Sequence, residues 1–214
     1  MISVLEDDAA LAAAVAALVA REPRFAIVVN RTGLPPLRRS PQGFAELLKI
    51  ITEQAISLKA AAQIWNRIST ALDPVTPARV EATEEGALIA LGLSGAKARC
   101  FRALASAAVD GRCPVANLAG LPDDAVRAAL TAVPGIGPWT AEIYLLASLG
   151  RADVWPAGDI ALQEAARDLL QLAQRPKGRV MIALAEPWRP WRAVAARLLW
   201  AHYRHLKAML QTPV

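Results

Sequence analysis

Apolar residues recur every three to four positions along most of the chain, and this period predicts amphipathic helices rather than strands. The clearest example begins at position 44, with apolar side chains at Phe44, Leu47, Leu48, Ile51, Ala55 and Leu58. Proline and glycine interrupt the pattern and divide it into segments. We therefore expect roughly ten helices, over 5–21, 41–58, 58–72, 78–84, 86–91, 95–110, 122–133, from 138 onward, 160–173, within 176–186 and over 191–210.

The segment 23–41 departs from this pattern. It is rich in helix-breaking residues, namely Pro23, Gly33, Pro35, Pro36 and Pro41. We expect a loop that links two parts of the chain. Extended backbone is an alternative for 25–29, but one isolated strand cannot form a sheet. A proline-bounded loop is also expected over 186–190. The predicted fold class is therefore all-α.

Composition supports a helical globular protein and leaves the partner open. The 214 residues suffice for one domain or two closely packed subdomains, and 55% of them are hydrophobic. Lys and Arg exceed Asp and Glu by 24 to 19, and the resulting pI of about 9.7 permits a polyanionic partner without establishing one. No apolar run reaches the length of a membrane span, and the acidic residues 6–8 argue against a signal peptide.

Metal-binding residues are scarce. Cys100 and Cys113 are the two cysteines, which excludes a four-cysteine iron–sulfur cluster or zinc site. We expect two reduced thiols. His202 and His205 are the two histidines, and we expect both at partly exposed positions of the last helix.

A glycine hairpin stands between two amphipathic helices within 121–149. Its sequence is Pro134, Gly135, Ile136, Gly137 and Pro138. Both glycines allow positive φ and close approach of a ligand to the backbone. Successive amides beside the N-terminus of the helix that begins at Pro138 would form an anion site suited to a phosphate. The alternative is an ordinary turn between two helices, which uses the same residue types.

Asp159 directly precedes the helix expected over 160–173. Its ordinary role there is to cap that helix. A catalytic role is compatible, because a helix N-terminus favours the ionised carboxylate. A carboxylate fixed in this way can stabilise an oxocarbenium ion and orient or deprotonate a water molecule.

The stretches LTAVPGIGPWTAEI and DVWPAGDIAL together resemble the helix–hairpin–helix-GPD DNA glycosylase superfamily. The type most similar is 3-methyladenine DNA glycosylase II, in a compact form without the N-terminal β-domain of some relatives. The resemblance runs from Phe44 to Tyr203 and includes FAELLKIITEQAISLKAAA and PWRAVAARLLW. It implies one continuous helical subdomain, 42–152, and a discontinuous one, 1–41 with 153–214, with a cleft between them.

The resemblance also implies an activity. Such an enzyme flips an alkylated purine, such as 3-methyladenine or 7-methylguanine, out of double-stranded DNA and hydrolyses its N-glycosidic bond. Asp159 would be the catalytic residue. Bifunctional relatives place a Lys where this chain has Trp139, so we expect water as the nucleophile and no strand cleavage. We further expect a cytoplasmic monomer without an iron–sulfur cluster.

Three alternatives stay open. A non-catalytic helix–hairpin–helix module would bind DNA without needing Asp159. A bifunctional oxidised-base glycosylase would cleave the strand as well as the base. A purely structural helical protein would have no salt-dependent affinity for DNA.

Further roles follow from the resemblance. Electron-rich rings attract a cationic alkylated base, so the predicted base pocket comprises Trp139, Trp200, Tyr203, Trp155, Ile143 and Gln54. For Trp65 and Trp188 we expect a place in the core, and Trp191 is left undecided. Predicted DNA contacts are Pro134, Gly135, Ile136, Gly137, Thr140, Ala55 and Ile56, where Ala55 is small for the wedge that relatives place after a Gln.

Two sets of charge contacts complete the expectations. Candidate phosphate contacts are Arg38, Arg39, Lys59, Lys97, Arg151 and Arg189, each of which has solvated surface charge as its alternative. By resemblance, the main-chain carbonyls of Thr131, Val133 and Ile136 hold Na⁺ or K⁺, which would bridge to a DNA phosphate.

Overall fold

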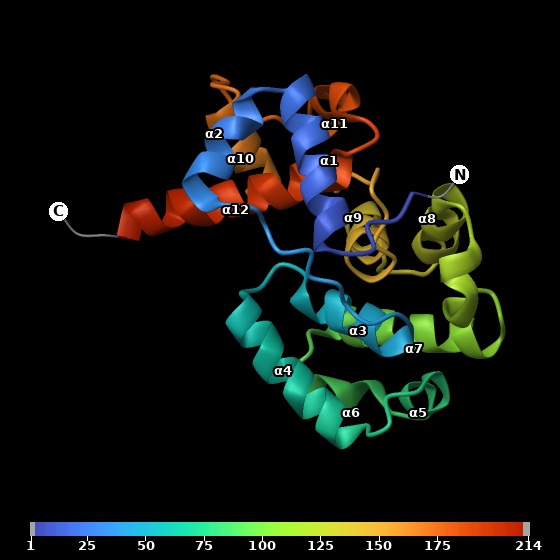
Figure 1. Cartoon of the computed structure of the whole chain (residues 1–214). Helices are drawn as coiled ribbons and strands as arrows, with labels where there is room; N and C mark the ends of the chain where they lie inside the picture. Colours follow the sequence, from blue (N-terminus) through green and yellow to red (C-terminus); the bar gives the residue numbers. More distant parts are fainter. Residues whose placement is uncertain (1–2, 212–214) are drawn as a thin grey trace. The chain divides into compact units, whose positions relative to one another are not determined.

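The computed structural model describes residues 3–211 and divides them into two compact units (Figure 1). One unit is Ser40–Leu149, and the other combines Met1–Arg39 with Gly150–Val214. The expected subdomain limits were 41/42 and 152/153. Among the described residues, regular secondary structure is helical, apart from an isolated antiparallel bridge between Val4 and Arg151. The all-α prediction is confirmed.

The unit Ser40–Leu149 has a core built from the apolar faces that the sequence pattern indicated. Leu47 and Ile51 of α3, Phe101 of α7, and Val126 and Leu130 of α8 are fully buried. Ser57 and Ser94 cap α4 and α7 by accepting backbone amides. The elements are α3 (Phe44–Glu53), α4 (Leu58–Ala71), α5 (Pro77–Glu81), α6 (Glu85–Ala90), α7 (Gly95–Val109), η1 (Val115–Gly120), α8 (Asp123–Thr131), α9 (Pro138–Ile143) and η2 (Tyr144–Ser148).

The second unit is organised around its longest helix, α12 (Arg192–Gln211), which packs against α1, α2 and α10 (Figure 1). Trp188 is buried in the core of this unit. Its ring lies edge-on to the rings of Phe25 and Trp155, with ring centres 5.2 Å and 5.5 Å apart. The other elements of this unit are α1 (Asp8–Arg21), α2 (Arg24–Thr32), α10 (Ile160–Leu169), α11 (Gly178–Ala185) and η3 (Glu186–Trp188).

The loop predicted for 23–41 is partly wrong, because α2 occupies Arg24–Thr32. Pro23 stands at the N-cap, where proline does not interrupt a helix. Phe25 and Val28 lie one helical turn apart and are fully buried, so tertiary packing stabilises a helix in this short segment. The extended alternative for 25–29 is therefore wrong as well.

A second correction concerns the helix expected from 41 to 58. The structure ends α3 at Glu53 and begins α4 at Leu58. Ala55, which fitted the apolar pattern, has a left-handed φ of 57° and lies exposed in the intervening loop. Elsewhere α10 ends at Leu169, just before Gln171 with a φ of 53°. The loop expected over 186–190 contains the short helix η3, and η1 was not predicted.

The structure also tests whether a helix could cross a membrane. Within 3–211, none of the helices combines the necessary length with the necessary apolar character.

Candidate nucleic-acid interface and catalytic carboxylate

In the unit Ser40–Leu149, α8 leads into a tight turn over 132–137, and α9 begins at Pro138. The amide of Ile136 donates to the carbonyl of Val133 at 3.0 Å and closes the turn. The side chains of Val133 and Ile136 are both buried. The predicted helix–hairpin–helix is therefore present, and its apolar side chains anchor it while Pro134 and Gly135 stay exposed.

The two hairpin glycines differ from each other. Gly135 has a φ of 92°, and a Cβ there would lie 2.7 Å from Cβ of Cys100. Gly137 has a φ of −93°, which other residues adopt readily, and a Cβ there would meet no atom of the described chain within 4 Å. Of the two glycines that allow positive φ, Gly135 adopts it and Gly137 does not. The fold itself requires glycine at position 135, whereas position 137 is open to an approaching partner.

Cys100 serves as a packing group beneath this turn. Burial raises the pKa of its thiol to about 11, so the thiol is protonated at neutral pH. Cys100 and Cys113 are both free and buried. The expectation of two reduced thiols is confirmed.

The start of α9 has the features of an anion site. Gly137 is its N-cap and Pro138 its first residue, and Gly137 makes no side-chain hydrogen bond to the first turn. The helix continues without a break into η2, because Ile143 and Tyr144 are both helical. The partial positive charge of such an N-terminus attracts an anion.

In the other unit, Asp159 caps α10, as its ordinary role predicted. Its Oδ1 accepts a hydrogen bond from the amide of Leu162 at 3.0 Å. The same oxygen accepts one from the indole Nε1 of Trp200 at 3.2 Å. The preceding loop is folded tightly, since the amide of Asp159 donates to the carbonyl of Pro156 at 2.9 Å. Backbone and side-chain contacts therefore both fix the carboxylate.

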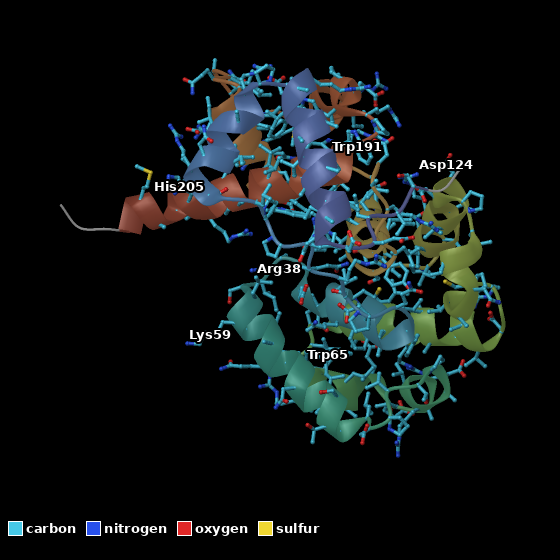
Figure 2. The ribbon with its side chains drawn as sticks, in the orientation of Figure 1. Arg38, Lys59, Trp65, Asp124, Trp191 and His205 are labelled. Carbon is cyan, nitrogen blue, oxygen red and sulfur yellow. The ribbon has the colours of Figure 1, made fainter. Side chains whose placement is uncertain are left out.

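Helix α12 contacts both ends of α10. Trp200 contacts Asp159 at the start of α10, and His202 bonds Asp168 near its end at 2.8 Å. Tyr203, one helical turn from Trp200, is partly exposed, with the Lys207 ammonium 5.6 Å from its ring centre. The structure thus brings Asp159, Trp200 and Tyr203 onto neighbouring parts of one unit. His202 is fully buried, which corrects its expected partial exposure, whereas His205 is partly exposed as expected (Figure 2).

The burial of the remaining tryptophans differs in part from the prediction. Trp155 is 6% exposed and donates its indole N–H to the carbonyl of Met181 at 3.0 Å, so its predicted place in the base pocket is wrong. Trp188 is in the core as expected. Trp65 is not, because α4 leaves it partly exposed, and Trp191 is also partly exposed just before α12 (Figure 2).

Several candidates of the unit Ser40–Leu149 lie close together. The Nε2 of Gln54 donates to Oγ1 of Thr140 at 2.7 Å. Thr140 is only 1% exposed and its side chain contacts Gln54, so any DNA contact at this residue would come from its backbone. Trp139 and Ile143 on α9 are partly exposed. Ala55 and Ile56 are exposed in the 54–57 loop.

Most of the candidate phosphate contacts are buried or bind other groups of the protein. Arg39 donates to the carbonyl of Leu5, Arg151 is buried, Lys97 donates to the carbonyls of Thr52 and Gln54, and Arg189 pairs with Asp153 and Glu186. Arg38 and Lys59 are exposed, each on its own unit (Figure 2). The sequence could not distinguish paired from exposed basic residues, because most of these partners are distant along the chain.

The profile of the HhH-GPD superfamily base excision DNA repair proteins matches residues 48–190 of the chain. This range includes both the hairpin and Asp159. The chain belongs to the HhH-GPD superfamily.

Two curated members of the superfamily resemble the chain over much of its length. DNA-3-methyladenine glycosylase 1 of Schizosaccharomyces pombe is 32% identical over 161 residues, which cover 73% of this chain and 71% of the relative. DNA-3-methyladenine glycosylase 2 of Escherichia coli is 31% identical over 171 residues, covering 74% of this chain and 56% of the relative.

Solved structures agree. The S. pombe 3-methyladenine DNA glycosylase in complex with abasic DNA superposes with a TM-score of 0.79 at 27% identity, covering 87% of this chain and 94% of that chain. A DNA-3-methyladenine glycosidase from Bacillus halodurans gives a TM-score of 0.76 at 30% identity and covers 89% of each chain. The resemblance inferred from the motifs is therefore confirmed.

Proposed function

We propose that this HhH-GPD protein is a monofunctional DNA glycosylase that excises alkylated purines, such as 3-methyladenine and 7-methylguanine, from double-stranded DNA. The observation that carries the proposal is the Asp159 carboxylate, held at the N-terminus of α10 by Leu162 and Trp200. The names of the relatives support the same substrate class.

The proposed chemistry uses the fixed charge of Asp159. An alkylated purine carries a positive charge, and it leaves as a neutral base when the bond from its nitrogen to C1′ of the sugar breaks. The electron pair of that bond goes to the base, so positive charge develops on the sugar. A carboxylate that needs no reorganisation stabilises this charge. A water oxygen then bonds to C1′ and loses a proton, which leaves an abasic site.

Trp139 makes the reaction monofunctional in this proposal. Strand cleavage by relatives depends on an amine that forms a Schiff base with the sugar. An indole cannot do so. Trp139, Trp200 and Tyr203 supply aromatic faces for a cationic base, and Ile143 adds apolar surface. Trp155 plays no part, because it lies in the core.

The hairpin would hold the DNA backbone through main-chain groups. Ile136 is buried, so any contact at that residue comes from its backbone. The open space at Gly137 supports close approach of a phosphate. Main-chain oxygens suit hard cations, so Thr131, Val133 and Ile136 would hold Na⁺ or K⁺, whose charge would attract the same phosphate. With two cysteines in the chain, the proposal includes no iron–sulfur cluster. The monomeric state and cytoplasmic location stay predictions.

The test is incubation of the purified protein with methylated duplex DNA, followed by chromatography of the released bases. We expect free methylated purines and a strand that breaks only after alkali treatment. Direct nicking, or an adduct trapped by borohydride, would favour a bifunctional glycosylase. Binding to DNA without base release would favour a non-catalytic module.

A further inference from the structure

The loop over 54–57, between α3 and α4, presents apolar side chains to solvent. Ile56 is 39% exposed, and Leu58, the first residue of α4, is 73% exposed. The loop is nevertheless tightly defined. Ala55 adopts a left-handed φ of 57°, which is uncommon for a residue with a Cβ. Ser57 then accepts the amide of Ala60 at 3.2 Å and caps α4.

Lys97 binds the N-terminal end of this loop. Its Nζ donates to the carbonyl of Thr52 at 2.8 Å and to the carbonyl of Gln54 at 2.7 Å. These carbonyls belong to the C-terminal end of α3, where helix carbonyls lack intrahelical partners and carry partial negative charge. An ammonium group is the natural partner for them.

The position of Lys97 in its own helix supports this role. It is the third residue of α7, and its backbone amide donates to the hydroxyl oxygen of the Ser94 cap. A cation in the first turn of a helix is disfavoured by the helix dipole, and burial lowers the pKa of Lys97. Helix α7 alone therefore does not explain a lysine here, whereas the two carbonyls at the end of α3 do.

The side chain of Gln54 binds the same end of the loop to α9 of the helix–hairpin–helix. Its amide group donates to Thr140, which is buried on α9 two residues after Pro138. Gln54 is thus held through its carbonyl by α7 and through its side chain by α9. The exposed apolar residues 56 and 58 follow directly after this doubly held residue.

We propose that Lys97 is a positioning residue that holds the 54–57 loop rigid while Ile56 and Leu58 enter the DNA duplex beside the flipped base. The inference rests on the proposed function. Inserting apolar side chains between bases unstacks the bases at a free-energy cost. A flexible loop would move away instead of unstacking them. Lys97 acts through the loop and does not contact a phosphate, in contrast to the expectation from sequence.

The test compares Lys97→Met with Lys49→Met, a matched control. Lys49 lies on α3, pairs with Glu46 at 3.6 Å and is partly exposed, so its replacement removes the same charge from the same unit. The probe is a duplex with a stable abasic-site analogue and a neighbouring 2-aminopurine, whose fluorescence rises when it unstacks. We expect wild type and Lys49→Met to raise the fluorescence, and Lys97→Met to raise it at least about threefold less.

The salt dependence of binding separates the two roles of Lys97. A lost phosphate contact reduces the slope of log K against log salt by about 0.9. We expect the slope of Lys97→Met to equal that of Lys49→Met, and Lys97→Arg, which keeps the donors and the charge, to recover part of the fluorescence. A slope reduced by about 0.9 relative to this control, or an undiminished fluorescence rise, would overturn the proposal.

A second variant keeps the test decisive if Lys97→Met does not fold. Ile56→Ser combined with Leu58→Ser changes exposed side chains and leaves Lys97 in place. We expect the same loss of fluorescence and an unchanged Tm. A normal fluorescence rise in this variant would refute insertion by the loop. Because the probe carries no excisable base, these results are independent of base release by the wild-type protein, which tests the proposed function separately.

Discussion

Two helix N-termini, those of α9 and α10, have central roles in the proposed reaction and are built in opposite ways. Helix α10 is capped by Asp159, whose carboxylate accepts an amide of the first turn. Helix α9 begins with Gly137 and Pro138, and its N-cap Gly137 has no side chain that could cap it. The same partial positive charge thus meets a carboxylate of the chain in one case and open space at Gly137 in the other.

This difference fits two ligand groups of opposite charge. At α10 the helix holds an anion, and that anion can stabilise positive charge developing on a sugar. At α9 the helix can itself attract an anion, such as a phosphate. A local feature with one sign of charge therefore serves both parts of the proposed reaction, depending on the residue at the N-cap.

The largest effect is expected for Asp159→Asn. Asparagine is an equally good N-cap, so α10 stays intact and only the charge is lost. We expect base release to fall by at least about 10³-fold, with DNA affinity and Tm nearly unchanged. Single-turnover release of methylated purines measures the effect. Release at the wild-type rate would remove Asp159 from the catalytic role.

Gly135→Ala comes next and should damage the fold of the hairpin. A Cβ at this position would combine a φ of 92° with a 2.7 Å approach to Cys100. Backbone strain and overpacking together predict a loss of about 2–4 kcal/mol in the free energy of unfolding. Urea denaturation followed by circular dichroism measures it. A variant as stable as wild type would show that the turn relaxes without cost.

Trp200→Phe tests how the carboxylate is held. Phenylalanine keeps an aromatic face but cannot donate to Oδ1 of Asp159. Since a hydrogen bond to a charged group contributes about 1.5–3 kcal/mol, we expect kcat to fall by about 10-fold. Trp191→Phe is the matched control and should keep wild-type kcat. If Trp200→Phe raises KM and leaves kcat unchanged, Trp200 only stacks on the base.

Gly137→Ala is expected to have the smallest effect, and an effect on binding alone. Position 137 has an unstrained φ and space for a methyl group, so the free energy of unfolding should change by less than about 0.5 kcal/mol. A methyl group would obstruct a phosphate, and we expect the Kd for duplex DNA to rise by about 3–10-fold. Fluorescence anisotropy measures it. Unchanged affinity would place the backbone contact elsewhere.

Much of the fold and part of the site could be predicted because they depend on local rules. The capping of α10 by Asp159 joins residues three apart, and the hairpin turn joins Val133 to Ile136. Such contacts are encoded by neighbouring residue types. The side-chain partners of Trp155 and Thr140 could not be predicted, because Met181 and Gln54 are distant from them in sequence.

The sequence by itself determined the all-α class, most of the helices, the hairpin and the place of Asp159, since helix period, caps and turn residues act over a few positions. Only the tertiary structure decided that α2 is a helix, that Trp155 is buried while Trp65 is partly exposed, and that Lys97 binds the end of α3. These features depend on which surfaces meet after folding. The burial of Phe25 and Val28 stabilises α2 although its local helix preference is weak. The partner of a charged side chain depends on which groups lie beside it after folding.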